Sequence, residues 1–271
     1  MRQIIGLLLF TFLTANIFAQ DIQQKNVPAV VLNAFKIKFP NATDVDWRLE
    51  KGNYQIKFEV NNKDNKLILD GRGNVVRHHQ DLYGSEVPES VLKIIKSKVA
   101  LYDLDDADRI TEGKNIFYEI SFEISGKDHD FWIDGNGKLI RYEKELKDSE
   151  IPAPITTLIK SKYGSLDIDY ARYREESEKI SYYIKGEIND KDHDFYFDGN
   201  ATLLKHNQDL RNSEIPVSIQ NTIKARYEGY EIRDADFIEE GKETFYDIEL
   251  RKSKEKVTLI LSPKGKILEI K

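Results

Sequence analysis

Residues 151–199, IPAPITTLIKSKYGSLDIDYARYREESEKISYYIKGEINDKDHDFYFDG, hold one copy of a phrase that this chain uses four times. Each copy opens with an aliphatic residue followed by proline, and three of the four close on an Asp-Gly turn. A fixed period predicts one repeated supersecondary unit, in which neighbouring units bury each other's apolar faces. The closing turns recur at a constant spacing, at Asp70-Gly71, Asp134-Gly135, Asp198-Gly199 and Ser262-Pro263. The opening pairs are Val27-Pro28, Val87-Pro88, Ile151-Pro152 and Ile215-Pro216, so the first copy is shorter than the others between its proline and its turn.

An amphipathic helix is predicted at the start of each copy. Apolar residues recur at every fourth position after the opening pair, which places them on one stripe of a helix. In the third copy these residues are Ile151, Ile155, Ile159 and Tyr163. Proline is favoured at the first helical position because its missing N–H would have no partner there. The stripe is expected to face the core.

After the helix, the four-residue spacing gives way to side chains that alternate between two faces. In the second copy Tyr118, Ile120 and Phe122 share one face of a strand, and Phe117 and Glu119 share the other. This period of two is typical of a half-buried strand. A further strand leads into each turn, where glycine supplies the positive φ of a tight hairpin, and an aliphatic pair opens a last strand. With a weaker strand before the central one, each copy is predicted as one helix plus three or four antiparallel strands.

Residues 1–19 have the order of a secretory signal peptide. Arg2 is followed by an apolar run over residues 4–13, and the segment ends on the small residue Ala19 ahead of Gln20. The run is too short to span a bilayer as a helix. We expect cleavage after Ala19, no membrane insertion of the remaining chain, and a periplasmic or secreted protein.

Composition excludes several classes of protein. The chain has no cysteine, so disulfides and thiol catalysis are ruled out. The formal net charge is −6, with interleaved signs and no basic block, so we expect no nucleic-acid partner. A charged fraction of 32% beside 40% hydrophobic residues is typical of a folded chain.

The order of these elements resembles the PepSY-like, beta-lactamase-inhibitor-protein-like family of exported bacterial proteins, many of them from Bacteroidetes. The likeness rests on the helix that begins at a proline, the strand Tyr118-Glu119-Ile120-Ser121-Phe122, the Asp-Gly-x-Gly hairpin and the closing aliphatic strand. The fourth copy departs from it, with Ser262-Pro263 at the turn and Lys256-Val257-Thr258 where copies two and three have Asp-His-Asp.

The resemblance implies an α+β fold in which the copies pair. Each pair would form one curved antiparallel sheet with its helices on one face, so that the chain has two such sheets. We therefore expect a signal peptide at residues 1–19, one PepSY-like domain at 20–147 and a second at 148–271. The inhibitor that gives the family its name grips an enzyme with its concave sheet surface, although a beta-lactamase target does not follow for this chain.

Two acidic triplets are the best candidates for a metal site. Asp128-His129-Asp130 and Asp192-His193-Asp194 occupy the same place in copies two and three. Alternation along a strand puts Asp130 and Asp134 on one face and His129 on the other, so neither triplet can chelate as a unit. We interpret the triplets as polar strand starts that recur with the repeat, with a cation site as the alternative, and expect no cofactor.

No catalytic constellation is evident. His78, His79 and His206 lie in closing strands without a nearby nucleophile, and the sequence has no glycine-rich phosphate loop. We therefore expect no enzyme, and a hydrolase site assembled across copies is the third hypothesis.

Aromatic residues on the polar strand faces are the candidate binding residues. If Tyr118 and Ile120 face the helix, the rings that point away from it are Phe117, Tyr183 and Phe245 in the central strands and Trp132 and Tyr196 in the next strands. Large amphipathic rings on a charged face are typical of binding hot spots, whereas adjacent rings also stabilise a sheet by packing across strands.

These observations favour an exported, non-enzymatic module that binds a protein or peptide of the cell envelope through its open sheet faces. The alternative is a structural or cation-binding envelope protein.

Overall fold

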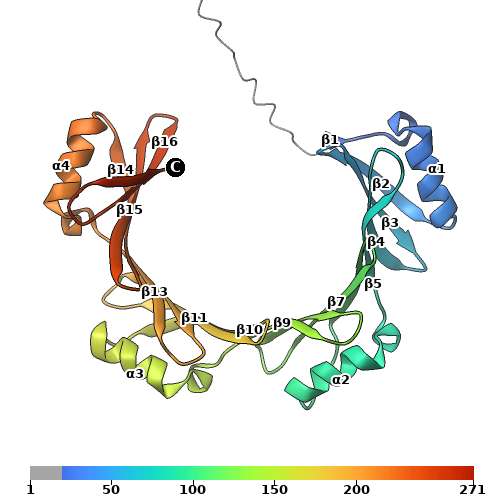
Figure 1. Ribbon diagram of the computed structural model, residues 1–271, viewed down its shortest axis with the longest axis horizontal. Coiled ribbons are helices and arrows are strands. Elements are labelled where there is room, and N and C mark those ends of the chain that lie inside the picture. Colours follow the sequence, from blue (N-terminus) through green and yellow to red (C-terminus); the bar gives the residue numbers. More distant parts are fainter. Residues whose placement is uncertain (1–19) are drawn as a thin grey trace, which may run out of the picture. The chain divides into compact units, whose positions relative to one another are not determined.

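The computed structural model describes residues 20–271, so the expected signal peptide at residues 1–19 lies outside the described residues. In this range there are four α-helices and seventeen β-strands (Figure 1). None of the described helices is both long and apolar enough to cross a membrane.

Each copy contains one helix followed by four strands, the upper value of the expected range. Copy one has α1 (Ala29–Lys38), β2 (Thr43–Glu50), β3 (Asn53–Val60), β4 (Lys63–Leu69) and β5 (Val75–Asp81), preceded by the short β1 (Gln20–Asp21). Copy two has α2 (Glu89–Lys98), β6 (Asp106–Glu112), β7 (Asn115–Glu123), β8 (Asp128–Asp134) and β9 (Leu139–Glu145). Copy three has α3 (Ala153–Lys162), β10 (Asp167–Glu176), β11 (Lys179–Glu187), β12 (Asp192–Asp198) and β13 (Leu203–Asp209). Copy four has α4 (Val217–Arg226), β14 (Glu231–Glu240), β15 (Glu243–Lys252), β16 (Glu255–Leu261) and β17 (Ile267–Ile270).

The predicted helical stripes are the buried faces of the four helices. The two central residues of every stripe are buried. They are Val31 and Phe35, Val91 and Ile95, Ile155 and Ile159, and Ile219 and Ile223. Each opening proline sits one position before its helix, where its fixed φ of −54° to −60° leads the chain into the first turn. A short 3₁₀ turn, which the sequence pattern did not predict, precedes every proline.

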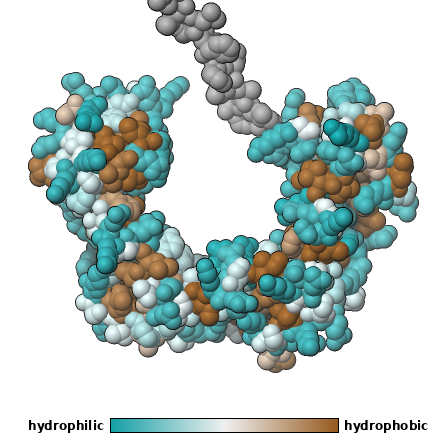
Figure 2. All heavy atoms as spheres, viewed as in Figure 1, coloured by the Kyte–Doolittle hydropathy of each residue, from teal (hydrophilic) through white to brown (hydrophobic). Residues whose placement is uncertain are grey.

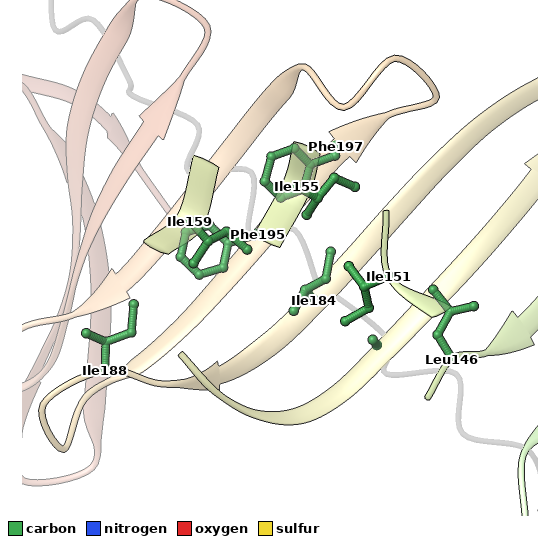
Figure 3. Packing of buried hydrophobic residues seen from close by; sticks show 9 residues of the cluster. Leu146, Ile151, Ile155, Ile159, Ile184, Ile188, Phe195 and Phe197 are labelled. Atoms are coloured by element: carbon green, nitrogen blue, oxygen red, sulfur yellow. The ribbon is translucent and has the colours of Figure 1, made fainter. Parts of the chain in front are cut away.

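The core of the third copy shows how helix and strands meet (Figure 3). Ile155 and Ile159 of α3 pack with Ile184 of β11 and with Phe195 and Phe197 of β12. All five side chains are at most 3% exposed. Equivalent clusters join α1 to β2–β4 and α4 to β14–β16. Hydrophobic residues gather where α3 and α4 meet their strands in Figure 2, so each of these two helices covers one face of the strands of its own copy.

The chain divides into two compact units. The first contains the described residues up to Val87 together with Asp106–Tyr118, and the second contains Pro88–Asp105 and Glu119–Lys271. In the first unit β1 to β6 pair antiparallel in chain order. In the second unit β8 to β17 do the same.

The strand ladder does not break between the second and third copies, where the resemblance implied a division into two sheets. β9 pairs with β10 over a continuous register that runs from Arg172 opposite Glu145 to Glu176 opposite Arg141. The joint between these copies is made like the joint between copies three and four: Leu146 N–H donates to Ala171 O, and Leu210 N–H donates to Ala235 O. Because the joint sequences are alike, they make the same strand pairing. The expected domain boundary after residue 147 stays a prediction.

The fold predicts that substitutions at two sites in the third copy have very different effects on the free energy of unfolding. Replacing Phe195, which is fully buried, leaves a cavity, so Phe195→Ala should lower the free energy of unfolding by about 3–5 kcal/mol. Leu204→Ala, at a half-exposed position, should change it by less than about 1 kcal/mol. Urea denaturation followed by circular dichroism measures both, and equal losses for the two variants would contradict this assignment of the core.

Candidate functional site

The candidate site lies on the face of β8–β12 that points away from the α3 core. Strand pairing fixes which residues share this face: Trp132 lies opposite Arg141, and Tyr183 lies between Arg172 on one neighbouring strand and Tyr196 on the other. Residues directly opposite each other in an antiparallel pair point to the same side of the sheet. We define the aromatic–arginine surface by its eight members. They are Trp132, Arg141, Glu143, Tyr170, Arg172, Arg174, Tyr183 and Tyr196.

A β-bulge in β10 lies directly before Tyr170 and turns Ile168 toward the core side of the sheet. Ile168 pairs with Gly186 but Tyr170 pairs with Lys185, so Asp169 is an extra residue on β10. The extra residue shifts the alternation, so that Ile168 packs against the core while Tyr170, Arg172 and Arg174 point to the outer face. A Cβ on Gly186 would lie 2.0 Å from the carbonyl oxygen of Asp167. Glycine is therefore required for the close approach of β10 and β11 beside the bulge.

Three tyrosines form the aromatic part of the surface. The ring centroids of Tyr183 and Tyr196 are 5.0 Å apart, and those of Tyr170 and Tyr183 are 6.0 Å apart. The Tyr183 hydroxyl donates a hydrogen bond to Asp194. Burial, followed by this hydrogen bond, raises the pKa of Tyr183, so the phenol stays protonated and remains a donor. Tyr196 is the most open of the five predicted residues, at 37% exposed, and it is available for contact.

Glu143 organises the arginine part of the surface. Its carboxylate lies 3.0 Å from Arg172 Nη1, 3.2 Å from Arg174 Nε and 3.6 Å from Arg141 Nε. The Glu143 side chain is only 9% exposed, whereas those of Arg172 and Arg174 are 43% and 41% exposed. One buried negative charge thus holds three guanidinium groups whose outer edges reach solvent. Such forks match the geometry of carboxylates on a partner.

Stacking fixes the orientation of two of these arginines. The Arg141 guanidinium carbon lies 3.4 Å from the ring centroid of Trp132, and that of Arg172 lies 5.3 Å from the ring of Tyr170. Cation–π contacts of this kind contribute about 0.5–2 kcal/mol each. The rings and guanidinium groups therefore form one ordered surface.

The five predicted residues are not brought together as one site. Trp132, Tyr183 and Tyr196 belong to the aromatic–arginine surface. Phe245 is half-buried on the same face of the second unit but lies opposite Ile238, four strands from Tyr183. Phe117 is half-buried on β7 and belongs to the first unit. The binding role of all five stays a prediction.

Five members of the surface are not evident from the sequence pattern, namely Arg141, Glu143, Tyr170, Arg172 and Arg174. A partial signal is present, because Tyr170, Arg172 and Arg174 alternate with Ala171 and Tyr173. The carboxylate that gathers the arginines, Glu143, comes from the preceding copy. This contact between copies cannot be read from a period of two.

The histidines of the acidic triplets lie in the core. His129 Nδ1 is 2.9 Å from the Tyr142 hydroxyl, and His193 Nδ1 is 2.9 Å from His206 Nε2. Burial lowers the pKa of His206 to about 4 and also lowers the pKa of His193, so both rings are neutral at pH 7. Asp194 faces the opposite side and binds Tyr183. The predicted alternation is confirmed, and each triplet is divided between the two faces of the sheet.

A pair of carboxyl groups lies farther along the same face. Asp209 of β13 is directly opposite Asp236 of β14. Burial, followed by a hydrogen bond with Asp209 and nearby acidic charges, raises the pKa of Asp236 to about 7. Burial also raises the pKa of Asp209. Two opposed carboxyl groups favour the protonated form of one of them.

Comparison with known families identifies the chain. The profile of the family described as "Putative beta-lactamase-inhibitor-like, PepSY-like" matches residues 16–77, 74–141, 124–205 and 186–269. The chain belongs to the PepSY-like family. The four matches confirm both the family and the fourfold repeat that the sequence indicated.

Three solved structures from Bacteroides are similar to parts of this PepSY-like chain. A DUF2874 family protein from Bacteroides uniformis is 20% identical, with 44% of this chain and 88% of that chain covered and a TM-score of 0.37. A protein of Bacteroides eggerthii described among "putative periplasmic proteins" is 17% identical, with the same coverage and a TM-score of 0.38. A BLIP-like protein from Bacteroides fragilis is 18% identical, with 46% and 93% covered and a TM-score of 0.37. A comparison with curated proteins found no match.

The role of Glu143 can be tested through stability. Glu143→Gln removes the charge that three guanidinium groups share and should lower the free energy of unfolding by about 1.5–3 kcal/mol. Glu187→Gln, an exposed position on β11, is the matched control and should change it by less than about 0.5 kcal/mol. Chemical denaturation at low and high salt measures the difference; an effect no larger than that of the control would contradict the proposed organisation of the arginines.

The Asp209–Asp236 pair predicts a pH dependence. The folded pKa of Asp236, about 7, lies above its ordinary value of 3.8. Between these values the folded chain binds more protons than the unfolded chain, so this group lowers stability as pH rises from about 4 to about 7. Asp236→Asn should therefore raise Tm by about 2–4 °C at pH 8, with a gain that shrinks as the pH falls toward 4.

Thermal unfolding over pH 4–8 measures this gain. Glu231→Gln, an exposed position at the start of the same strand, provides the control. A gain for Asp236→Asn that is constant with pH would show that the carboxyl pair is not its source.

Proposed function

We propose that this PepSY-like chain is an exported, non-enzymatic, inhibitor-like module that binds a protein or peptide of the cell envelope. The aromatic–arginine surface is the observation that carries this proposal. It combines clustered tyrosines, a tryptophan and oriented arginines, the residue types that dominate binding hot spots. Family membership supports the inhibitor-like character of the module.

The position of the helices supports the same proposal. In the second unit α3 and α4 lie on one side of the strands in Figure 1, and their cores use one set of alternating side chains. The aromatic–arginine surface uses the other set. No described helix of the second unit packs against that surface, which leaves it available to a partner.

The contacts of the surface indicate what a partner would supply. Tyr196 and Tyr183 provide flat rings with hydroxyl groups, and Arg172 and Arg174 present partly exposed guanidinium groups. A segment with apolar and acidic side chains would satisfy both. Most of the affinity is expected from the rings, because aromatic anchors exclude water from the polar contacts around them.

The proposal is tested by selecting peptides that bind the chain and then measuring how substitutions in the chain change their affinity. A displayed peptide library panned against the chain should yield sequences whose affinity falls at least tenfold for the double variant Trp132→Ala/Tyr196→Ala. Tyr83→Ala removes an exposed tyrosine of the first unit and should leave affinity within twofold of the wild type. Circular dichroism verifies that both variants fold. Peptides that bind the double variant as well as the wild type would refute the proposal.

A further inference from the structure

The outer edge of β17 differs from the edges of the other closing strands. In the second unit β9 pairs with β10 and β13 pairs with β14, and in the first unit β5 pairs with β6. Each closing strand thus receives the first strand of the next copy. Among the described residues no strand pairs with β17 on the side away from β16.

The backbone of β17 presents hydrogen-bonding groups at this edge. Lys271 exchanges two hydrogen bonds with Thr258 of β16, of 2.9 and 3.2 Å. Backbone groups alternate along an antiparallel strand, so the N–H and C=O groups of Ile270 and Leu268 point to the outer edge. The side chains of Ile270 and Leu268 are 60% and 52% exposed. The edge is therefore both unpaired and partly apolar.

The third copy shows which strand occupies the equivalent edge. Leu204 and His206 occupy in copy three the positions that Leu268 and Ile270 occupy in copy four. The Leu204 carbonyl accepts a hydrogen bond from Gly241 N–H, and His206 lies opposite Glu239 of β14. The incoming strand runs antiparallel and places a glutamate beside the end of the preceding helix.

That glutamate is held by two residues at the end of α3. Lys162 forms an ion pair with Glu239, and the Tyr163 hydroxyl donates to it at 2.8 Å. The preceding joint repeats the contact, since Lys98 at the end of α2 lies 2.7 Å from Glu175 of β10. Two joints of the second unit thus use one clasp, in which a helix-terminal cation binds a glutamate of the next strand.

Copy four has the helix-terminal residues of this clasp, but no described strand supplies the glutamate. Arg226 and Tyr227 occupy the positions in this copy that Lys162 and Tyr163 occupy in copy three. Tyr227 packs against the fourth core, and in copy three the ring centroid of the equivalent Tyr163 lies 4.2 Å from that of His206, which occupies the position of Ile270. Arg226 is exposed at the end of α4, and no described residue forms an ion pair with it.

We propose that the outer edge of β17 binds an extended acidic segment of a partner protein, which adds as an antiparallel strand with a glutamate held by Arg226 and Tyr227. Strand addition of this kind draws affinity from backbone hydrogen bonds and specificity from side-chain pockets. The segments that fill the two clasped joints share an aromatic residue two positions before the glutamate, Tyr173 before Glu175 and Phe237 before Glu239. The partner segment is expected to carry the same aromatic-x-Glu pattern. This site is separate from the aromatic–arginine surface.

The probe is a synthetic peptide with the sequence of residues 231–240, which contains Phe237 and Glu239. It should bind the chain and slow amide hydrogen exchange at Ile270, the N–H that would pair. Reversing the charge of the glutamate in the peptide (Glu239→Lys) should weaken binding about tenfold. Arg226→Glu in the chain should weaken binding of the original peptide to a similar extent and restore binding of the reversed peptide.

Two control variants test whether peptide binding depends on this edge. Lys224→Glu makes the same charge change on an exposed residue of α4 and should leave binding within twofold of the wild type. Trp132→Ala/Tyr196→Ala should bind the peptide as the wild type does, so failure of the proposed function and of this inference are distinguishable. Equal affinities of the original and reversed peptides, an absence of binding, or protection confined to residues outside β17 would overturn the proposal.

Discussion

The burial of one helical stripe against one face of four strands is the constraint on which the rest of this structure depends. Ile155 and Ile159 can reach Ile184, Phe195 and Phe197 only because these side chains point to the same side of the sheet. Because side chains alternate along a strand, every intervening side chain points to the other side of the sheet. The residues of that side are free of the core, and the second unit uses them for rings and charges.

The joint between copies contributes a second constraint. Pairing of β9 with β10 places Glu143 of copy two against Arg172 and Arg174 of copy three. The same joint on the core side pairs Lys98 with Glu175. Copy two is thus completed by copy three, through an ion pair on either face of the sheet. The aromatic–arginine surface belongs to a joint between copies, which is why no single copy contains it.

The core tolerates one polar pair at a repeated position because the two partners satisfy each other. Asn65 with His78, His129 with Tyr142, and His193 with His206 occupy the same place in copies one to three, and each pair is separated by 2.9 Å. Val257 and Ile270 stand there in copy four. A buried polar group is tolerated in a core where it has a hydrogen-bond partner. This packing role accounts for the histidines that the sequence singled out as metal candidates.

The sequence by itself determined the fourfold repeat, the helical stripes, the alternation of strand faces and the membership of the family, because these depend on patterns that recur along the chain. It also placed Trp132, Tyr183 and Tyr196 on the face away from the helix. Only the tertiary structure decided that β9 pairs with β10, that the bulge at Asp169 turns Ile168 to the core side, and that Glu143 gathers three arginines. The physical reason is that pairing between copies and the register of a bulge arise from contacts between distant residues, and a local period carries no record of them.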